Sequence, residues 1–246
     1  MSAVLLNVLI GLVTSVLSGG AVLTWRRVRD TRIIRRKAAF FGLRPGRTCL
    51  IVLNDHYDKP GSTSHNDVHT LIEIAALAHE ASCPISVLPA GGLHESNGDR
   101  TEFCIGGPTS NPRTAGHLAV HLPGVSVRSF SAGRDPGIII VGSAQFPFEH
   151  GRLEHALIAK FTPANSSAPV IVICGQRSID NRAAINFLQR EYRSLSRSVG
   201  SPDRFCLVVR MISSDTYGHQ SAEVAADVTG AAFAARRAPS AATAVP

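Results

Sequence analysis

The chain alternates between short, unbroken apolar runs and longer stretches in which apolar and polar residues recur at helical spacing. An apolar run rich in branched side chains predicts a strand that is buried on both faces of a sheet. Such runs predict strands at residues 48–53, 85–88, 102–105, 125–128, 137–141, 156–161, 170–174 and 204–212. Residues 145–155 show neither pattern, and we expect them to be irregular.

Helices are predicted between several of these strands. Residues 64–82 have Ser64 or Asn66 as a cap, an apolar face in between, and Pro84 as a stop. Further helices are expected at residues 112–121, 180–199 and 220–235. Because strands alternate with helices, we predict an α/β fold. It is Rossmann-like, with a mostly parallel sheet and helices on both faces.

The N-terminal segment differs from the rest of the chain. Residues 2–25 carry no charged side chain, and residues 4–23 form a mostly apolar stretch long enough to span a bilayer as a helix. Trp25 and a block of arginines follow, as at the inner end of a membrane helix. We therefore predict a transmembrane anchor over residues 1–25 and a basic juxtamembrane segment over residues 26–46, with the helix continuing to Phe41.

This arrangement predicts a single-pass protein of the inner (plasma) membrane, with the lipid bilayer as a partner. The positive charges follow the apolar stretch, so the N-terminus is expected outside and the C-terminal domain in the cytoplasm. Gly11, Ser15 and Gly19 lie four residues apart, a spacing that lets two membrane helices approach closely. A homodimer through this face is one hypothesis; the alternative is that small residues are simply common in such helices.

Glycine and proline at positions 42, 45 and 46 mark the end of the N-terminal element, so we place the α/β domain at residues 47–237. Residues 238–246 hold small side chains and proline and are expected to be a disordered tail. The net charge of +7 is concentrated in residues 26–37, which hold seven of the 25 Lys and Arg residues and one of the 18 acids. The remainder is close to neutral, which argues against a nucleic-acid partner.

The five cysteines show no C-x-x-C spacing, so a zinc site of cysteines is not expected. Four of them lie in apolar runs, which is typical of buried, reduced thiols. Cys104 and Cys174 precede glycine turns, but no base stands beside either in the sequence, so we interpret both as structural. His65 and His69 share a helix face near His56. A third ligand would have to come from the loop, so no metal site is predicted.

Two strand ends carry the candidate site. In each, an apolar strand runs into glycine and then into hydroxyl and amide side chains at the start of a helix. Backbone amides and a helix N-terminus at one point suit a phosphate group, and an arginine can bind it bidentately. The predicted ligand-binding residues are Gly106, Gly107, Pro108, Ser110, Asn111, Gly175, Arg177, Ser178 and Asn181. The alternative interpretation is that these are ordinary tight turns.

The common nucleotide and hydrolase motifs are absent from the sequence. It contains no G-x-x-x-x-G-K-[ST] loop, no G-x-G-x-x-G after the first strand, no G-x-S-x-G and no H-E-x-x-H. These absences argue against a P-loop enzyme, an ordinary dinucleotide dehydrogenase, an α/β-hydrolase with a nucleophile elbow, and a zinc protease of the H-E-x-x-H kind.

The run FCIGGPTSNPRT, with the later run CGQRSIDNRAAINFL, resembles a Rossmann-like group of nucleotide-binding domains in bacteria. That group is loosely related to the TIR and sirtuin-type domains of bacterial conflict and antiphage systems. Gly106, Gly107, Pro108 and Asn111 match its first element, and Gly175 with Asn181 matches the second. The order of anchor, arginine block and domain also resembles single-pass membrane proteins of actinobacteria. The resemblance implies binding, and in related domains cleavage, of NAD or another nucleotide.

Two functions from different classes follow. The first is a membrane-anchored nucleotide-binding sensor or effector, with NAD or a related nucleotide as its ligand. The second is a hydrolase of the N-glycosidic bond of a nucleotide, with Asp55, Asp67 or Glu102 as the carboxylate. No catalytic glutamate or histidine of the TIR or sirtuin kind can be placed, so the sequence leaves catalysis open. A scaffold with a non-functional pocket is the third interpretation.

Overall fold

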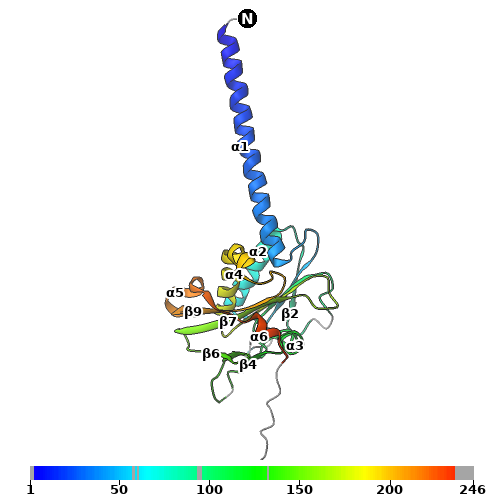
Figure 1. Ribbon diagram of the computed structural model, residues 1–246, viewed down its shortest axis with the longest axis vertical. Coiled ribbons are helices and arrows are strands. Elements are labelled where there is room, and N and C mark those ends of the chain that lie inside the picture. Colours follow the sequence, from blue (N-terminus) through cyan, green and yellow to red (C-terminus); the bar gives the residue numbers. More distant parts are fainter. Residues whose placement is uncertain (1–2, 57–58, 60, 93–95, 132, 236–246) are drawn as a thin grey trace, which may run out of the picture. The chain divides into compact units, whose positions relative to one another are not determined.

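The computed structural model describes residues 3–56, 59, 61–92, 96–131 and 133–235 (Figure 1). It divides into two compact units, Met1–Lys37 and Ala38–Pro246. The second unit begins earlier than the sequence signals at residues 42–46 indicated, because the last turn of α1 (Ala3–Phe41) belongs to the core. Phe40 and Phe41 are buried there, and the ring of Phe41 lies against Phe103. The predicted tail lies outside the described residues.

Helix α1 continues to Phe41 as expected. Within the described residues, however, no helix combines the length and the apolar character that crossing a membrane requires. The prediction of a transmembrane helix over residues 1–25 therefore gains no support from the structure. Asn7, Thr14 and Ser15 are among the polar residues that interrupt the apolar stretch. The hydroxyl of Ser15 donates to the carbonyl of Gly11 within the same helix, at 2.8 Å.

The core of the second unit is a seven-stranded sheet with the strand order β10-β9-β7-β8-β3-β1-β2. Strands β2, β1, β3 and β8 are parallel neighbours, whereas β7 and β10 run in the opposite direction to the rest. The mostly parallel sheet that the apolar runs predicted is thus confirmed. The strands are β1 (Cys49–Leu53), β2 (Ile85–Pro89), β3 (Thr101–Ile105), β7 (Leu153–Phe161), β8 (Val170–Gly175), β9 (Phe205–Ile212) and β10 (Glu223–Asp227).

Helices cover both faces of this sheet, also as predicted. Figure 1 shows α2 (His65–Glu80) and α4 (Ser178–Ser198) on one face, and α3 (Pro112–His121) and α6 (Thr229–Phe233) on the other. Successive strand residues point to opposite faces, so Phe103 and Cys104 belong to separate apolar clusters. A separate antiparallel sheet of β4 (Val125–Val127), β5 (Ile139–Val141) and β6 (Ala144–Phe146) adds to the α3 side.

The prediction of a helix over residues 220–235 is wrong. The segment instead contains the end of a 3₁₀ turn, η1 (Gly218–Ser221), then strand β10 and the short helix α6, and it follows α5 (Ser214–Tyr217). Pairing of β10 with β9 at the sheet edge outweighs the helix propensity of its alanines. The segment 145–155 is also more ordered than expected, since it holds the end of β6 and the start of β7.

The connection from β2 to β3 positions the site. The chain passes from β2 over β1 to reach β3, so the strand order reverses between β1 and β3. In open α/β sheets, ligands bind beyond the carboxyl ends of the strands at such a reversal. The described residues of the connection, 90–92 and 96–100, form no helix. One flank of α3 is therefore left without a neighbouring crossover helix.

Candidate functional site

The two strand ends singled out by the sequence do lie side by side. Strands β3 and β8 are parallel neighbours, and the amide of Gly106 donates to the carbonyl of Ile173 at 2.8 Å. The end of β1 joins them, because the amide of Asp55 donates to the carbonyl of Ser110 at 3.2 Å. The polar residues that follow β1, β3 and β8 therefore lie at one edge of the sheet, whereas β5 belongs to the separate sheet.

Glycine is required at position 106. Its φ is +102°, and a Cβ there would lie 2.6 Å from the Cβ of Asn54. Gly107, Pro108 and Ser110 are half-buried beside it. The turn thus brings the backbone close to the end of β1, and Gly107 and Ser110 keep part of their surface open to a ligand.

Asn111 holds the start of α3 rather than presenting a free amide. Its Oδ1 accepts from the backbone amides of Arg113 (2.9 Å) and Thr114 (3.1 Å). Its Nδ2 donates to the carbonyl of Ile105 at 2.8 Å. This N-cap ties the first turn of α3 to the end of β3 and so orients the side chains that follow.

Asn181 has a similar structural role at the second strand end. Its Oδ1 accepts from the amide of Gly175 at 2.7 Å, and its Nδ2 donates to Oδ1 of buried Asp67 at 2.8 Å. A Cβ on Gly175 would lie 2.7 Å from the carbonyl oxygen of Arg177, so this glycine permits close packing of β8 against α4. Ser178 is half-buried in the first turn of α4.

Arg177, expected to bind a phosphate, is paired with acids instead. Its Nη1 lies 2.7 Å from Oε1 of Glu154 and 3.4 Å from Oδ1 of Asp215. Glu154 is buried and also accepts from the hydroxyl of Ser214 and the amide of Gly151. The guanidinium charge is therefore balanced within the protein, which weakens its predicted role as an anion ligand.

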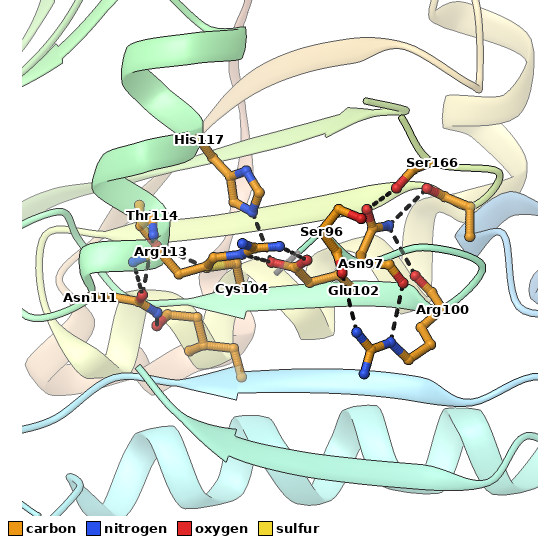
Figure 2. Close-up of polar contacts among 12 residues, drawn as sticks. Ser96, Asn97, Arg100, Glu102, Cys104, Asn111, Arg113, Thr114, His117 and Ser166 are labelled. Atoms are coloured by element: carbon orange, nitrogen blue, oxygen red, sulfur yellow. Dashed lines mark hydrogen bonds and ion pairs between the residues drawn. The ribbon is translucent and has the colours of Figure 1, made fainter. Parts of the chain in front are cut away.

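A second polar cluster lies between α3 and strand β3 (Figure 2). Glu102 is fully buried on β3, and Arg113 donates to both of its oxygens, from Nε (2.9 Å) and from Nη2 (2.8 Å). His117, one helical turn further, lies with Nε2 2.8 Å from Oε1 of Glu102. Figure 2 shows both side chains pointing from α3 toward the strand. Spacing of four residues along a helix brings them to one face.

The charge state of Glu102 follows from these partners. Burial by itself raises the pKa of the carboxyl group, but hydrogen bonds from Arg113 and His117 outweigh it and lower the pKa to about 2. Glu102 is therefore an anion that fixes Arg113 and orients His117. Because its oxygens are committed to these donors, it does not fit the catalytic carboxylate proposed for it from the sequence.

A pocket of about 440 Å³ opens beside this cluster, between α3 and the β2–β3 connection. Among its described lining residues, every titratable group is basic: Arg113, His117 and His121. Burial, followed by the nearby charges of His117 and Arg113, lowers the pKa of His121. The other described lining residues are Ala90, Gly91, Ser96, Asn97, Pro112, Gly116, Val120, Pro163 and Asn165. The pocket thus combines basic groups, amide side chains and apolar surface.

Glu102, Cys104 and His117 also bring three potential metal-ligand atoms within 4.8 Å of one another. They do not fit a metal ion. Arg113 already uses both oxygens of Glu102. Burial raises the pKa of the Cys104 thiol, which lies 3.2 Å from the hydroxyl of Thr114, so the thiol keeps its proton.

The sequence interpretation named Glu102 but missed its partners and the pocket. One signal was present: a glutamate in an otherwise apolar strand requires a buried partner. Arg113, His117 and His121 recur every four residues on the next helix, in positions that can supply it. Asp55, the third candidate carboxylate, lies half-buried at the end of β1.

Comparison with models of protein families, with curated proteins and with solved structures finds no match for this chain.

Proposed function

We propose that this protein binds a small anionic ligand of the nucleotide class in the pocket beside α3. The observation that carries the proposal is the pocket of about 440 Å³ in which Arg113, His117 and His121 are the titratable groups among the described lining residues. Pockets for small molecules fall in a range of roughly 300–1,000 Å³. Arg113 shares its charge with Glu102, and the imidazoles of His117 and His121 add ring nitrogens that can hydrogen-bond to an anion.

The site is rigid before a ligand arrives. Glu102 holds the guanidinium of Arg113 at two points, and Asn111 fixes the helical turn that carries it. Such preorganisation lowers the entropy lost on binding. Asn165 supplies an amide group, and Val120 with Pro163 supplies apolar surface for a flat ring.

The turn predicted from the sequence contributes by its position. Pro112 and Arg113 in the pocket wall belong to the first turn of α3, directly after Gly106–Asn111. A phosphate at this end of the pocket would lie near the N-terminus of α3, where the helix dipole favours negative charge. Gly107 and Ser110, which are half-buried there, remain ligand-binding candidates.

Filling the pocket tests the proposal. Gly116 lines the pocket, and a Cβ at this position meets no atom within 4 Å, so Gly116→Leu is expected to fold. The binding of ATP, NAD and cyclic AMP would be measured by calorimetry. We expect at least one of them to bind the unmodified protein and to lose roughly tenfold or more in affinity for Gly116→Leu.

Ala119→Leu is the matched control, because Ala119 is exposed on α3 and does not line the pocket. It should bind like the unmodified protein. Equal binding to both variants, or no binding of any of the three nucleotides to the unmodified protein, would refute this pocket as a nucleotide site.

Hydrolysis of the bound nucleotide is the second candidate function. It is favoured by the contact between His117 and Glu102, since a carboxylate that orients an imidazole is a common general-base arrangement. Release of nicotinamide or free base that His117→Gln abolishes, while nucleotide binding persists, would establish an enzyme. Binding without any product would establish a sensor.

We further propose that the N-terminal unit brings the protein to an anionic membrane surface. The observation that supports this proposal is a group of exposed arginines on α1, namely Arg26, Arg27, Arg29, Arg32, Arg35 and Arg36. Clustered arginines attract anionic headgroups. The protein should float with phosphatidylserine vesicles and less with phosphatidylcholine vesicles. Equal recovery with both would reject the electrostatic attachment.

A further inference from the structure

Two imidazole rings meet on the surface of α2, away from the pocket. Nε2 of His65 lies 3.0 Å from Nε2 of His69, one helical turn further along. The ring centroids are 4.4 Å apart and the ring planes are inclined by 78°. His65 is exposed and His69 is half-buried, so the two nitrogens converge at a point that solvent can reach.

The separation of these nitrogens matches a chelate. Zinc binds imidazole nitrogen at about 2.0–2.1 Å, so two nitrogens on one ion at an angle of 90–110° lie about 3 Å apart. The side chains need no large movement to share an ion. In the hydrogen bond between the rings, the Nε2 of one ring donates a proton to the Nε2 of the other. When both rings carry their proton on Nδ1 instead, both Nε2 atoms can bind one cation.

A third histidine, His219, lies in another element that packs against α4. His219 lies in η1 and is half-buried. Burial lowers the pKa of His219, and the charges of Arg182 and His69 lower it further, while Glu73 opposes them. His219 is not a ligand of the pair, because among the described residues only Glu102, Cys104 and His117 bring three potential ligand atoms within 4.8 Å of one another.

The elements that carry these rings are held together. Both α2 and η1 pack against α4. Asp67, between the two histidines of α2, accepts from Nδ2 of Asn181 of α4 at 2.8 Å, and its amide donates to the hydroxyl of the N-cap Ser64 at 3.3 Å. Glu73, one turn beyond His69, is paired with Arg182 at 3.3 Å. The helical turn with His65 and His69 is therefore fixed relative to α4.

We propose that His65 and His69 chelate one divalent d-block cation. Imidazole nitrogens without carboxylate oxygens select Zn²⁺, Ni²⁺ or Cu²⁺ over Mg²⁺ and Ca²⁺. Remaining positions on the ion stay open to water or to a further ligand. The site is separate from the pocket beside α3 and does not depend on nucleotide binding.

Titration of the full chain with Zn²⁺, Ni²⁺ and Mg²⁺, followed by calorimetry, tests the site. We expect Zn²⁺ and Ni²⁺ to bind with a stoichiometry of one and Mg²⁺ not to bind. His65→Gln and His69→Gln should each lower the affinity by roughly tenfold or more, because one imidazole alone is not a chelate. His219→Gln should bind the ions like the unmodified protein.

His79→Gln is the control, since His79 is exposed at the other end of the same helix. It should bind like the unmodified protein. Co²⁺ gives a second measurement: the expected spectrum lacks the thiolate charge-transfer band that a Cys104 ligand would produce. Undiminished binding to His65→Gln and His69→Gln, a thiolate band, or no Zn²⁺ binding to the unmodified protein would overturn the proposal.

Discussion

Two buried carboxyl groups behave in opposite ways because their neighbours differ. Glu102 faces a guanidinium and an imidazole, which lower its pKa to about 2 against the effect of burial. Burial raises the pKa of Asp180, and the charge of Glu154 raises it further. Each carboxyl group holds the beginning of a helix. Glu102 accepts from Arg113 of α3, and Asp180 accepts from the amide of Arg177 at the start of α4.

Because the pKa of Glu102 is lowered in the folded protein, the stability of the protein is expected to decrease at acidic pH. The ordinary value is 4.5, so the contribution of Glu102 is fully present above pH 4.5 and is lost as the pH falls toward 2. The shift corresponds to about 3 kcal/mol for this fully buried group. The free energy of unfolding in urea, compared between pH 7 and pH 3, measures the loss of this contribution.

Glu102→Gln should lower the free energy of unfolding at pH 7 by about 3–5 kcal/mol, because it breaks a buried ion pair. The difference from the unmodified protein should shrink at pH 3. A variant that loses stability with acid as steeply as the unmodified protein would show that another carboxyl group is responsible.

At the scale of elements, the last turn of α1 is part of the core. Phe41 is fully buried, and Phe40 stacks on Phe205 at 5.9 Å between ring centroids. The buried ammonium of Lys160 donates to the carbonyl of Phe40 at 2.7 Å and so satisfies a carbonyl at the helix end. The sequence predicted the helix to Phe41 but not this burial, because its glycine and proline signals come only after Phe41.

Phe41→Ala should therefore destabilise the protein by about 3–5 kcal/mol, the usual cost of removing a buried ring. Phe130→Ala is a fair comparison, since Phe130 is 52% exposed. Thermal unfolding followed by circular dichroism should show a large decrease for Phe41→Ala and a small one for Phe130→Ala. Similar decreases would contradict the placement of Phe41 in the core.

The elements also show which parts of the fold the sequence could predict. Strands such as β8 and β3 were predicted from apolar runs because burial on both faces leaves a local signature. Strand β10 was mistaken for a helix because it is stabilised by pairing with β9, and pairing between distant segments leaves no pattern in the local sequence. For the same reason, the sequence located the turn at Gly106 but not the pocket, whose wall joins α3 to residues distant along the chain.

At the scale of the whole molecule, the compact unit begins at Ala38. A protein that starts at residue 47 lacks Phe40, Phe41 and Leu43, all of them buried. The lost burial is comparable with the total stability of a typical domain, about 5–15 kcal/mol. We expect residues 38–235 to fold and residues 47–235 to lack a cooperative thermal transition. Equal melting curves for the two would place the boundary where the sequence had indicated it.

All five cysteines are buried in the second unit, and none forms a disulfide. Burial raises the pKa of each thiol, so the reactive thiolate is scarce as well as inaccessible. Oxidants and alkylating reagents can therefore reach these sulfurs chiefly when the sheet opens. The rate of alkylation therefore reports how often the native structure opens.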